Sequence, residues 1–230
     1  MKRQNKLSVI IPFLNEEKTL PRTLKKVLAR PEVWEVVLVD DGSTDNSAKV
    51  IFKYLNRKVR LVKHIKNRGK GAAIRTGVRS VKGDYILIQD ADLELDPREY
   101  PKILKPLWEE NFDFVVGTRW KNSEGSLLFK SGNLLLTTLT NILFGVKIED
   151  LYCGYKAGSK KTWRELKLTS NRFEIEAEIG AKLGKFKKRV KNVEVLYVNP
   201  RSYKQGKKIK FKDAYEGLVM ILKIRFFNFL

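Results

Sequence analysis

The first half of the chain alternates short, nearly continuous apolar runs with longer amphipathic segments. Five runs rich in valine and isoleucine are predicted as buried parallel strands: 7–11, 35–39, 59–62, 85–88 and 113–116. Helical periodicity predicts four helices between them: 20–29, 45–55, 71–81 and 101–110. Alternation of strands and helices implies right-handed crossovers and helices on both faces of one sheet. The pattern therefore predicts an α/β fold with a mostly parallel central sheet.

The second half of the chain has a different pattern. Helices are predicted over 127–144 and 174–183, and a strand over 193–198. A C-terminal amphipathic helix is predicted over 213–230, with an apolar stripe formed by Tyr215, Leu218, Val219, Leu222, Phe226 and Phe229. Two interpretations of this stripe stay open, because it suits packing against the core and, with its flanking cations, also an interfacial membrane helix.

Composition describes a globular chain of one domain. It has 230 residues, of which 43% are hydrophobic and 32% charged. The single cysteine excludes an internal disulfide framework. The N-terminus lacks the features of a secretory signal, and no apolar run approaches the roughly 18–20 residues of a membrane span. We therefore expect a soluble or peripheral protein.

The net charge of +21 is unevenly distributed. Nine acidic and three basic residues lie in 84–113, whereas twelve basic residues and one acidic residue lie in 182–212. The acidic stretch can hold a cation. The basic stretch can contact phosphates or an anionic membrane, although a solvated surface is the alternative.

Two acidic clusters follow predicted strands. Asp90-Ala91-Asp92 comes directly after 85–88, and Asp40-Asp41-Gly42-Ser43 follows an earlier strand. The carboxyl ends of parallel strands meet at one edge of the sheet, where ligands of such folds bind. Mg²⁺ and Mn²⁺ prefer carboxylate oxygens, and substrate phosphates complete their shell. An Asp-x-Asp triplet alone is weak, but the two clusters together favour a nucleotide-sugar site, with metal ligands Asp90, Asp92 and Glu94.

Single residues at this edge and elsewhere also have predicted roles. Asp40 is predicted to contact the base or ribose, whereas Asp41 is predicted to shape the turn. Lys70 lies between two glycines at the start of a predicted helix, where it can contact a donor phosphate or be an ordinary surface lysine. His64 and Cys153 are predicted to be structural.

A series of motifs spans about residues 7 to 225. Its segments are 9–17, 39–45, 67–73, 90–94, 117–119, 150–156, 171–176 and 201–208. In order and spacing the series resembles the family 2 glycosyltransferases of the GT-A fold. Within them it is similar to the polyprenyl- and dolichyl-phosphate sugar synthases, such as the dolichyl-phosphate mannose synthases.

The resemblance implies a fold, a reaction and a division of the chain. The fold is a Rossmann-like nucleotide-binding α/β domain over 1–230. Its parts are a nucleotide-sugar and metal half (1–118), an acceptor half (119–212) and the C-terminal helix (213–230). The reaction is inverting transfer of a hexose from a GDP-mannose or UDP-glucose type of donor to a dolichyl or polyprenyl phosphate, with Mg²⁺ or Mn²⁺. The enzyme is expected at the cytoplasmic face of the membrane as a peripheral protein.

The resemblance also implies roles for single residues. Asp92, Asp150 and Arg119 are the expected catalytic residues; Asp150 takes a proton, orients the acceptor or a basic partner, or is instead a turn or capping residue. Donor and phosphate contacts are expected from Pro12, Phe13, Glu16, Asp40, Lys70, Asp90, Lys130, Arg201, Lys207 and Lys208. Glu94 stands where dolichyl-phosphate mannose synthases usually have glutamine, which weakens the inference to GDP-mannose.

Three other functions are weighed against this one. The same fold can transfer a sugar to a saccharide hydroxyl, and the same carboxylates can serve a metal-dependent hydrolase. A basic nucleic-acid-binding domain is suggested only by the net charge, since the chain has no recognisable nucleic-acid motif and its acidic edge repels phosphates. We therefore expect a nucleotide sugar, a lipid phosphate and a membrane surface as partners, and no nucleic acid.

Overall fold

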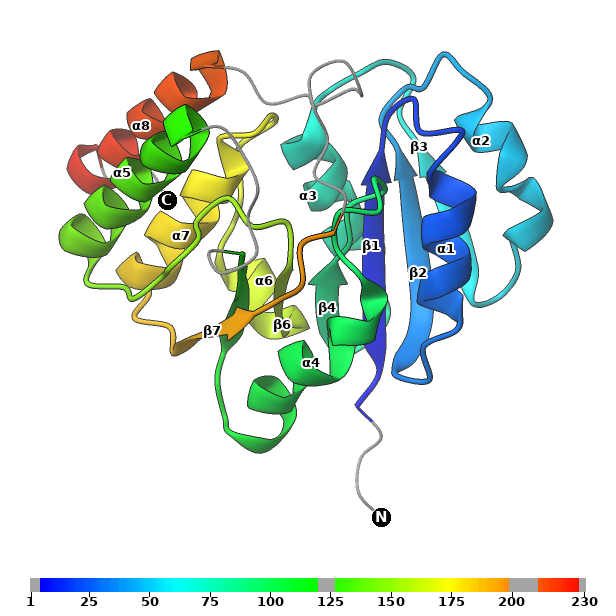
Figure 1. Cartoon of the computed structure of the whole chain (residues 1–230), viewed down its shortest axis with the longest axis horizontal. Helices are drawn as coiled ribbons and strands as arrows, with labels where there is room; N and C mark the ends of the chain where they lie inside the picture. Colours follow the sequence, from blue (N-terminus) through cyan, green and yellow to red (C-terminus); the bar gives the residue numbers. More distant parts are fainter. Residues whose placement is uncertain (1–4, 120–126, 199–210, 228–230) are drawn as a thin grey trace.

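A seven-stranded sheet runs through the molecule, with helices on both of its faces (Figure 1). The structure is a computed structural model that describes residues 5–119, 127–198 and 211–227. The strand order is β3-β2-β1-β4-β6-β5-β7. The strands are β1 (Leu7–Phe13), β2 (Val33–Asp40), β3 (Val59–Lys63), β4 (Tyr85–Ile88), β5 (Phe114–Thr118), β6 (Lys156–Ser159) and β7 (Val190–Glu194). Only β6 runs antiparallel to its neighbours in this sheet, so the predicted α/β fold with a mostly parallel sheet is confirmed.

Two helical layers enclose the sheet. One contains α1 (Leu20–Leu28), α2 (Ser47–Val50), the short 3-10 helices Phe52–Tyr54 and Pro97–Glu99, and α4 (Tyr100–Glu109). The other contains α3 (Lys70–Ser80), α6 (Lys160–Glu165) and α7 (Ile175–Lys185). Outside α7 lie α5 (Leu127–Phe144) and α8 (Phe211–Phe226), and these three helices form one end of the molecule (Figure 1).

Strand β1 explains how one sheet serves two cores. All seven of its residues are buried, as expected of a central parallel strand. Successive side chains point to opposite faces. Val9 and Ile11 pack into the core with α1 and α4, whereas Ile10 packs into the core with α3. A Cβ on Gly77 of α3 would lie 2.4 Å from Cγ2 of Ile10, so glycine permits this close approach.

The crossovers of the chain leave the sheet in two directions from β1. Strand β1 pairs with β2 on one side and with β4 on the other, and β3 lies beyond β2. The strand order therefore reverses between β1 and β4. In open α/β sheets this switch point opens a crevice beyond the carboxyl ends of the strands, where ligands bind. Phe13, Asp40 and Ile88 are the residues that end β1, β2 and β4 at this edge.

Two elements of the second half were not predicted. Strand β6 pairs antiparallel with both β4 and β5, and α6 follows it directly. Its sequence, Lys-Ala-Gly-Ser, has no β-branched residue, so the pairing is imposed by its neighbours and not by local propensity. The strand predicted at 193–198 is displaced, because β7 covers Val190–Glu194 at the edge of the sheet beside β5.

The C-terminal helix forms, but its buried side is not the predicted stripe. Ile221 and Ile224 of α8 are buried, whereas Tyr215 and Phe226 of the predicted stripe are 67% and 68% exposed. A Cβ on Gly217 would lie 2.3 Å from the Tyr152 hydroxyl, so glycine sets the side of α8 that packs. The amphipathic character predicted for the C-terminal helix is therefore not confirmed. Phe229, the last residue of the stripe, lies outside the described residues.

Candidate active site

The loop after β4 carries Asp90, Asp92 and Glu94, and we call it the acidic loop. One buried side-chain amide fixes its start. Gln89 is fully buried, and its Oε1 accepts hydrogen bonds from the hydroxyls of Tyr100 and Tyr155, each at 2.9 Å. Its Nε2 donates to the carbonyls of Asp90 and Leu95, at 3.1 and 3.2 Å. Gln89 therefore sets where the acidic triplet leaves the sheet. The one sequence signal for it was a polar residue at the end of a buried apolar strand.

Asp90 belongs to a chain of alternating charges. The Lys70 ammonium lies 2.9 Å from Oδ1 of Asp90 and 3.0 Å from Oε1 of Glu176. The other oxygen of Glu176 lies 2.5 Å from Nζ of Lys156, which also donates to the carbonyls of Leu151 and Cys153. Burial acts to lower the pKa of Lys70, but the two carboxylates outweigh it and raise the pKa above its usual range. Lys70 thus stays charged beside the acidic loop.

The start of α3 is packed against protein on both sides. The backbone amide of Gly69 donates to Oδ2 of Asp41 at 2.7 Å, and that of Ala72 donates to the carbonyl of Asn171 at 2.9 Å. Gly69 has φ +97°, and a Cβ there would lie 2.3 Å from the same carbonyl. These two amides are therefore engaged within the protein, and the donor-phosphate contact expected of Lys70 stays a prediction.

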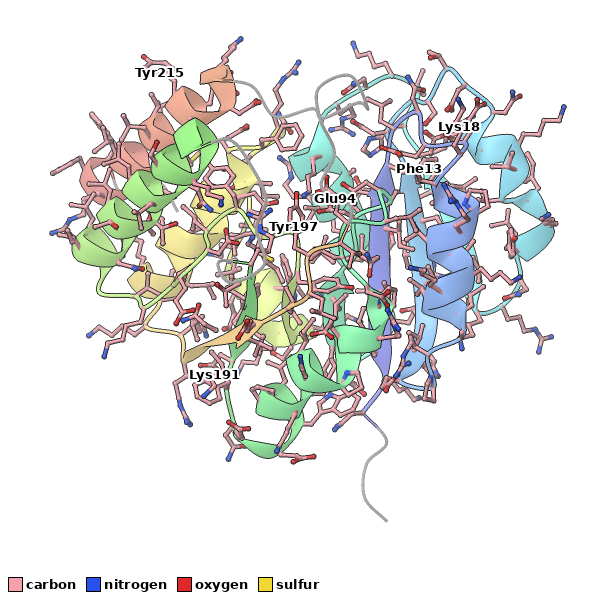
Figure 2. All side chains as sticks on the ribbon, viewed as in Figure 1. Phe13, Lys18, Glu94, Lys191, Tyr197 and Tyr215 are labelled. Carbon is pink, nitrogen blue, oxygen red and sulfur yellow. The ribbon has the colours of Figure 1, made fainter. Side chains whose placement is uncertain are left out.

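Asp92 and Glu94 continue the acidic loop. Asp92 Oδ1 accepts the backbone amide of Glu94 at 3.1 Å, and Glu94 Oε2 accepts the Tyr197 hydroxyl at 2.9 Å. Figure 2 shows Glu94 and Tyr197 beside each other in the middle of the molecule. Within the described ranges, no three histidine, cysteine or acidic side chains are gathered to hold a metal ion. The three predicted ligands therefore form no ready-made cage, and their role as ligands stays a prediction.

Arg119 and Asp150 form a bidentate ion pair. Nε of Arg119 lies 2.7 Å from Oδ2 of Asp150, and its Nη2 lies 2.9 Å from Oδ1. The Asn133 amide also donates to Oδ1, at 2.7 Å. Burial would raise the pKa of Asp150, but Arg119 and Asn133 outweigh burial and lower that pKa. Of the predicted roles for Asp150, orienting a basic partner fits this geometry, because a carboxylate with a lowered pKa is a weak proton acceptor.

Tyr197 joins the two predicted halves of the site. The guanidinium carbon of Arg119 lies 5.2 Å from the centre of the Tyr197 ring, and the hydroxyl of that ring bonds to Glu94. The backbone amide of Val198 also donates to the Glu94 carbonyl at 2.8 Å. Tyr197 therefore links the acidic loop to the ion pair of Arg119 with Asp150. No sequence pattern singled it out, since it follows the strand β7, whose position was itself predicted wrongly.

The expected nucleotide end lies beyond β1 and β2. Pro12 and Phe13 are buried at the end of β1, and Glu16 accepts the Thr19 hydroxyl at 2.6 Å. Asp40 is fully buried; its Oδ1 accepts the backbone amide of Ser43, and no described residue donates a hydrogen bond to its Oδ2. Nζ of Lys63 lies 3.8 Å from Oδ2. A buried carboxylate oxygen with spare acceptor capacity suits the predicted contact with base or ribose, which stays a prediction.

Two candidates are structural, as predicted. His64 contacts Oδ1 of Asp41 through Nδ1 at 2.7 Å and the Thr76 hydroxyl through Nε2 at 3.0 Å, so both ring nitrogens have partners. Cys153 is buried in the core, and burial raises the pKa of its thiol to about 12. A thiol that stays protonated is a poor nucleophile.

The remaining predicted phosphate contacts lie in the acceptor half. Lys130 is partly buried in the first turn of α5. Arg201, Lys207 and Lys208 lie outside the described residues, so their predicted roles stay predictions. Among the described residues, no helix combines the length and apolar character needed to cross a bilayer.

The sequence is similar to known sugar transferases. Residues 8–166 match the profile of the family described as Glycosyl transferase family 2. Dodecaprenyl-phosphate galacturonate synthase of Rhizobium johnstonii is 32% identical over 169 residues, which are 70% of this chain and 50% of the relative. Undecaprenyl-phosphate 4-deoxy-4-formamido-L-arabinose transferase of Proteus mirabilis is 36% identical over 160 residues, 66% of this chain and 48% of the relative. The chain spans about half the length of the curated relatives it matches.

The fold is similar to that of solved sugar transferases. Glucosyl-3-phosphoglycerate synthase of Mycobacterium tuberculosis, solved with Mn²⁺, UDP and glucosyl-3-phosphoglycerate, has a TM-score of 0.72 and 20% identity; the match covers 96% of this chain and 80% of the other. Mannosyl-3-phosphoglycerate synthase of Rubrobacter xylanophilus has a TM-score of 0.73 and 17% identity, with 95% and 73% covered. The expected GT-A fold is thereby confirmed.

The resemblance inferred from the motifs is also confirmed, because both relatives are named for polyprenyl-phosphate carriers. The sugars in their names are galacturonate and 4-deoxy-4-formamido-L-arabinose. These relatives therefore do not confirm the mannosyl or glucosyl type expected from the sequence. The matched profile covers well over half of the chain. The protein is a member of glycosyl transferase family 2.

Proposed function

We propose that this chain transfers a hexose from a nucleotide sugar to a polyprenyl or dolichyl phosphate, with inversion at the anomeric carbon. The observation that carries the proposal is the link made by Tyr197. It joins the acidic loop, suited to a donor diphosphate and cation, to Arg119, suited to an acceptor phosphate. The names of the curated relatives support a lipid-phosphate acceptor.

The acidic loop fits a divalent cation. Asp90 already accepts a cation, the Lys70 ammonium, and protein sites for Mg²⁺ commonly use only one or two carboxylates together with substrate phosphates. Asp90 and Asp92 would hold the ion, with Glu94 beside them. When bound, Mg²⁺ or Mn²⁺ neutralises the charge that develops on the departing nucleoside diphosphate.

The acceptor half suits an attacking phosphate. A phosphomonoester has a second pKa of about 6 and is largely ionised near neutral pH, so it needs little help from a general base. Its oxygen forms the new bond to the anomeric carbon as the bond to the diphosphate breaks, and that electron pair leaves with the diphosphate. Asp150 holds Arg119 rigidly, and a fixed guanidinium fork is well suited to phosphate oxygens. Lys130, Arg201, Lys207 and Lys208 are proposed to add positive charge around the acceptor or donor.

The nucleotide is proposed to lie at the ends of β1 and β2. Pro12, Phe13 and Glu16 would line the base and ribose, and the spare acceptor oxygen of Asp40 would take a hydrogen bond from one of them. GDP-mannose and UDP-glucose are the donor types proposed.

We further propose that the enzyme meets its lipid as a peripheral protein at the cytoplasmic face of the membrane. Large apolar side chains are exposed on the two outermost helices: Leu134, Leu135 and Ile142 on α5, and Tyr215, Leu222 and Phe226 on α8. We name this set the α5–α8 face. Apolar side chains on a cationic helix suit the headgroup region of a bilayer.

The proposal is tested by release of nucleoside diphosphate from a panel of nucleotide sugars, with Mn²⁺ and a short polyprenyl phosphate. We expect release to require both the metal and the lipid phosphate, and to fall at least about a hundredfold in Asp92→Asn. Release that needs only a free saccharide would instead identify a glycan-assembling enzyme. Release without any acceptor would identify a hydrolase, and either outcome would reject the proposed function.

A further inference from the structure

The series of ion pairs at the acidic loop is buried at one end and partly exposed at the other. Glu176 is 3% exposed and is held by Lys156, which is 2% exposed and bonded to two backbone carbonyls. At the other end, the side chains of Lys70 and Asp90 are 17% and 23% exposed. The Glu176 end is thus anchored in the core, whereas the contact between Lys70 and Asp90 is partly exposed to solvent.

Lys70 already occupies an oxygen of Asp90 that a divalent cation would need. The ammonium lies 2.9 Å from Oδ1 of Asp90. A Mg²⁺ ligand oxygen lies about 2.1 Å from the metal, so an ion that approaches this oxygen from the side of the ammonium would take the place of the ammonium. The opposite oxygen of Asp90 is confined, because a Cβ on Gly154 would lie 2.0 Å from Oδ2. Asp90 therefore has little room to turn and serve both cations.

We propose that Lys70 is the resident counter-ion of Asp90, that a divalent cation displaces it there, and that Glu176 retains the displaced ammonium at the diphosphate. The inference rests on the proposed function. It makes Lys70 a metal competitor in the free enzyme and a phosphate ligand in the loaded one. Glu176 is then a positioning residue that acts through Lys70.

The chemistry of the two groups supports this exchange. Lysine carries a compact charge on a flexible four-carbon stem, so its ammonium can move while its backbone stays in α3. Glu176 cannot follow the ammonium toward the metal, because Lys156 holds its second oxygen at 2.5 Å. Without nucleotide, metal binding must overcome the lost pair of Lys70 with Asp90. With nucleotide, the ammonium gains a phosphate partner, so metal and nucleoside diphosphate favour each other.

The test measures Mn²⁺ binding to the whole chain by electron paramagnetic resonance, without nucleotide. We expect Lys70→Met to bind Mn²⁺ about tenfold more tightly than the parent, since it removes a positive charge next to a ligand. In the presence of Mn²⁺, the same variant should bind UDP or GDP about tenfold more weakly by calorimetry. Lys70→Gln is the second variant if the first does not fold.

Lys26→Met is the matched control. Lys26 pairs with Asp96 on the same loop at 3.3 Å, so the change removes the same charge but leaves Asp90 alone. Its Mn²⁺ affinity should equal that of the parent. Equal or weaker Mn²⁺ binding by Lys70→Met, with nucleotide still bound, would overturn this inference alone. No binding of Mn²⁺ by any variant, with or without nucleotide, would overturn both this inference and the proposed function.

Discussion

Two buried side chains, Gln89 and Glu176, hold the proposed site together through hydrogen bonds and ion pairs that connect different elements of the fold. The Gln89 amide has two donor hydrogens and two acceptor lone pairs, and its four bonds use all of them. The Glu176 carboxylate likewise has a lysine on each oxygen. Asp90, Asp92, Arg119 and Asp150 were located from the sequence because each follows a strand or a motif. Lys70 was singled out as well, but its pairing with Asp90 and Glu176 was not predicted, because the two helices that carry Lys70 and Glu176 come together only in the folded chain.

At the scale of single residues, we predict that Gly154→Ala weakens nucleotide binding. The new Cβ would lie 2.0 Å from Oδ2 of Asp90, so the carboxylate must move. We expect Mn²⁺-dependent binding of UDP or GDP to fall at least about tenfold by calorimetry, because ligand geometry at a metal is narrow. Gly132→Ala in α5 is the control: nothing lies within 4 Å of its Cβ position, and alanine favours the helix. Unchanged nucleotide binding in Gly154→Ala would show that the position of Asp90 does not matter.

Elements were predictable where a local pattern decided them. Strands β1 and β4 are nearly continuous apolar runs, and the predicted bounds of α5 agree with the structure. Strand β6 has no such pattern. A Cβ on Gly158 would lie 2.6 Å from Cδ2 of Phe114, so this strand fits between β4 and β5 because a small residue allows it. The second half of the sheet is thus specified by tertiary packing, which periodicity does not report.

At the scale of elements, Glu35 joins the ends of three strands away from the site. Its carboxylate accepts the Ser8 hydroxyl from β1, the Arg60 guanidinium from β3 and the backbone amides of Lys82 and Gly83 before β4. Burial would raise its pKa, but these donors outweigh burial and lower the pKa from its ordinary value of 4.5. A carboxyl with a lowered pKa stabilises the fold above its ordinary pKa, and the contribution is lost as the pH falls.

We therefore predict a pH-dependent cost of Glu35→Gln. Near pH 7 the variant should have a lower free energy of unfolding than the parent, by about 1–3 kcal/mol, because Arg60 loses its charged partner. The difference should shrink as the pH falls below 4.5, where the parent carboxyl also begins to take a proton. Urea denaturation at a series of pH values measures it. Glu109→Gln, on an exposed carboxylate at the end of α4, is the control. A cost independent of pH would contradict the lowered pKa.

At the scale of the whole molecule, the acidic loop and the α5–α8 face lie in different places. The acidic loop lies at the switch point of the sheet, although the net charge is +21. Helices α5 and α8, which carry the α5–α8 face, lie at the opposite end of the molecule from α2 (Figure 1). Figure 2 shows Tyr215 of this face at the outer edge of the molecule. If the bilayer meets the protein there, the chain approaches the membrane with its helical end and leaves α2 in water.

This arrangement predicts that binding to anionic vesicles depends on the α5–α8 face. Replacing exposed Leu135 and Phe226 by serine should weaken cosedimentation with phosphatidylglycerol vesicles at least about fivefold, because each side chain loses apolar area that the headgroup region would bury. Neither side chain is part of the core, so the melting temperature should change little. Phe52→Ser is the control, since Phe52 is 60% exposed at the far end, beside α2. Equal loss in Phe52→Ser would indicate nonspecific adhesion, and undiminished binding of the double variant would place the membrane contact on another surface.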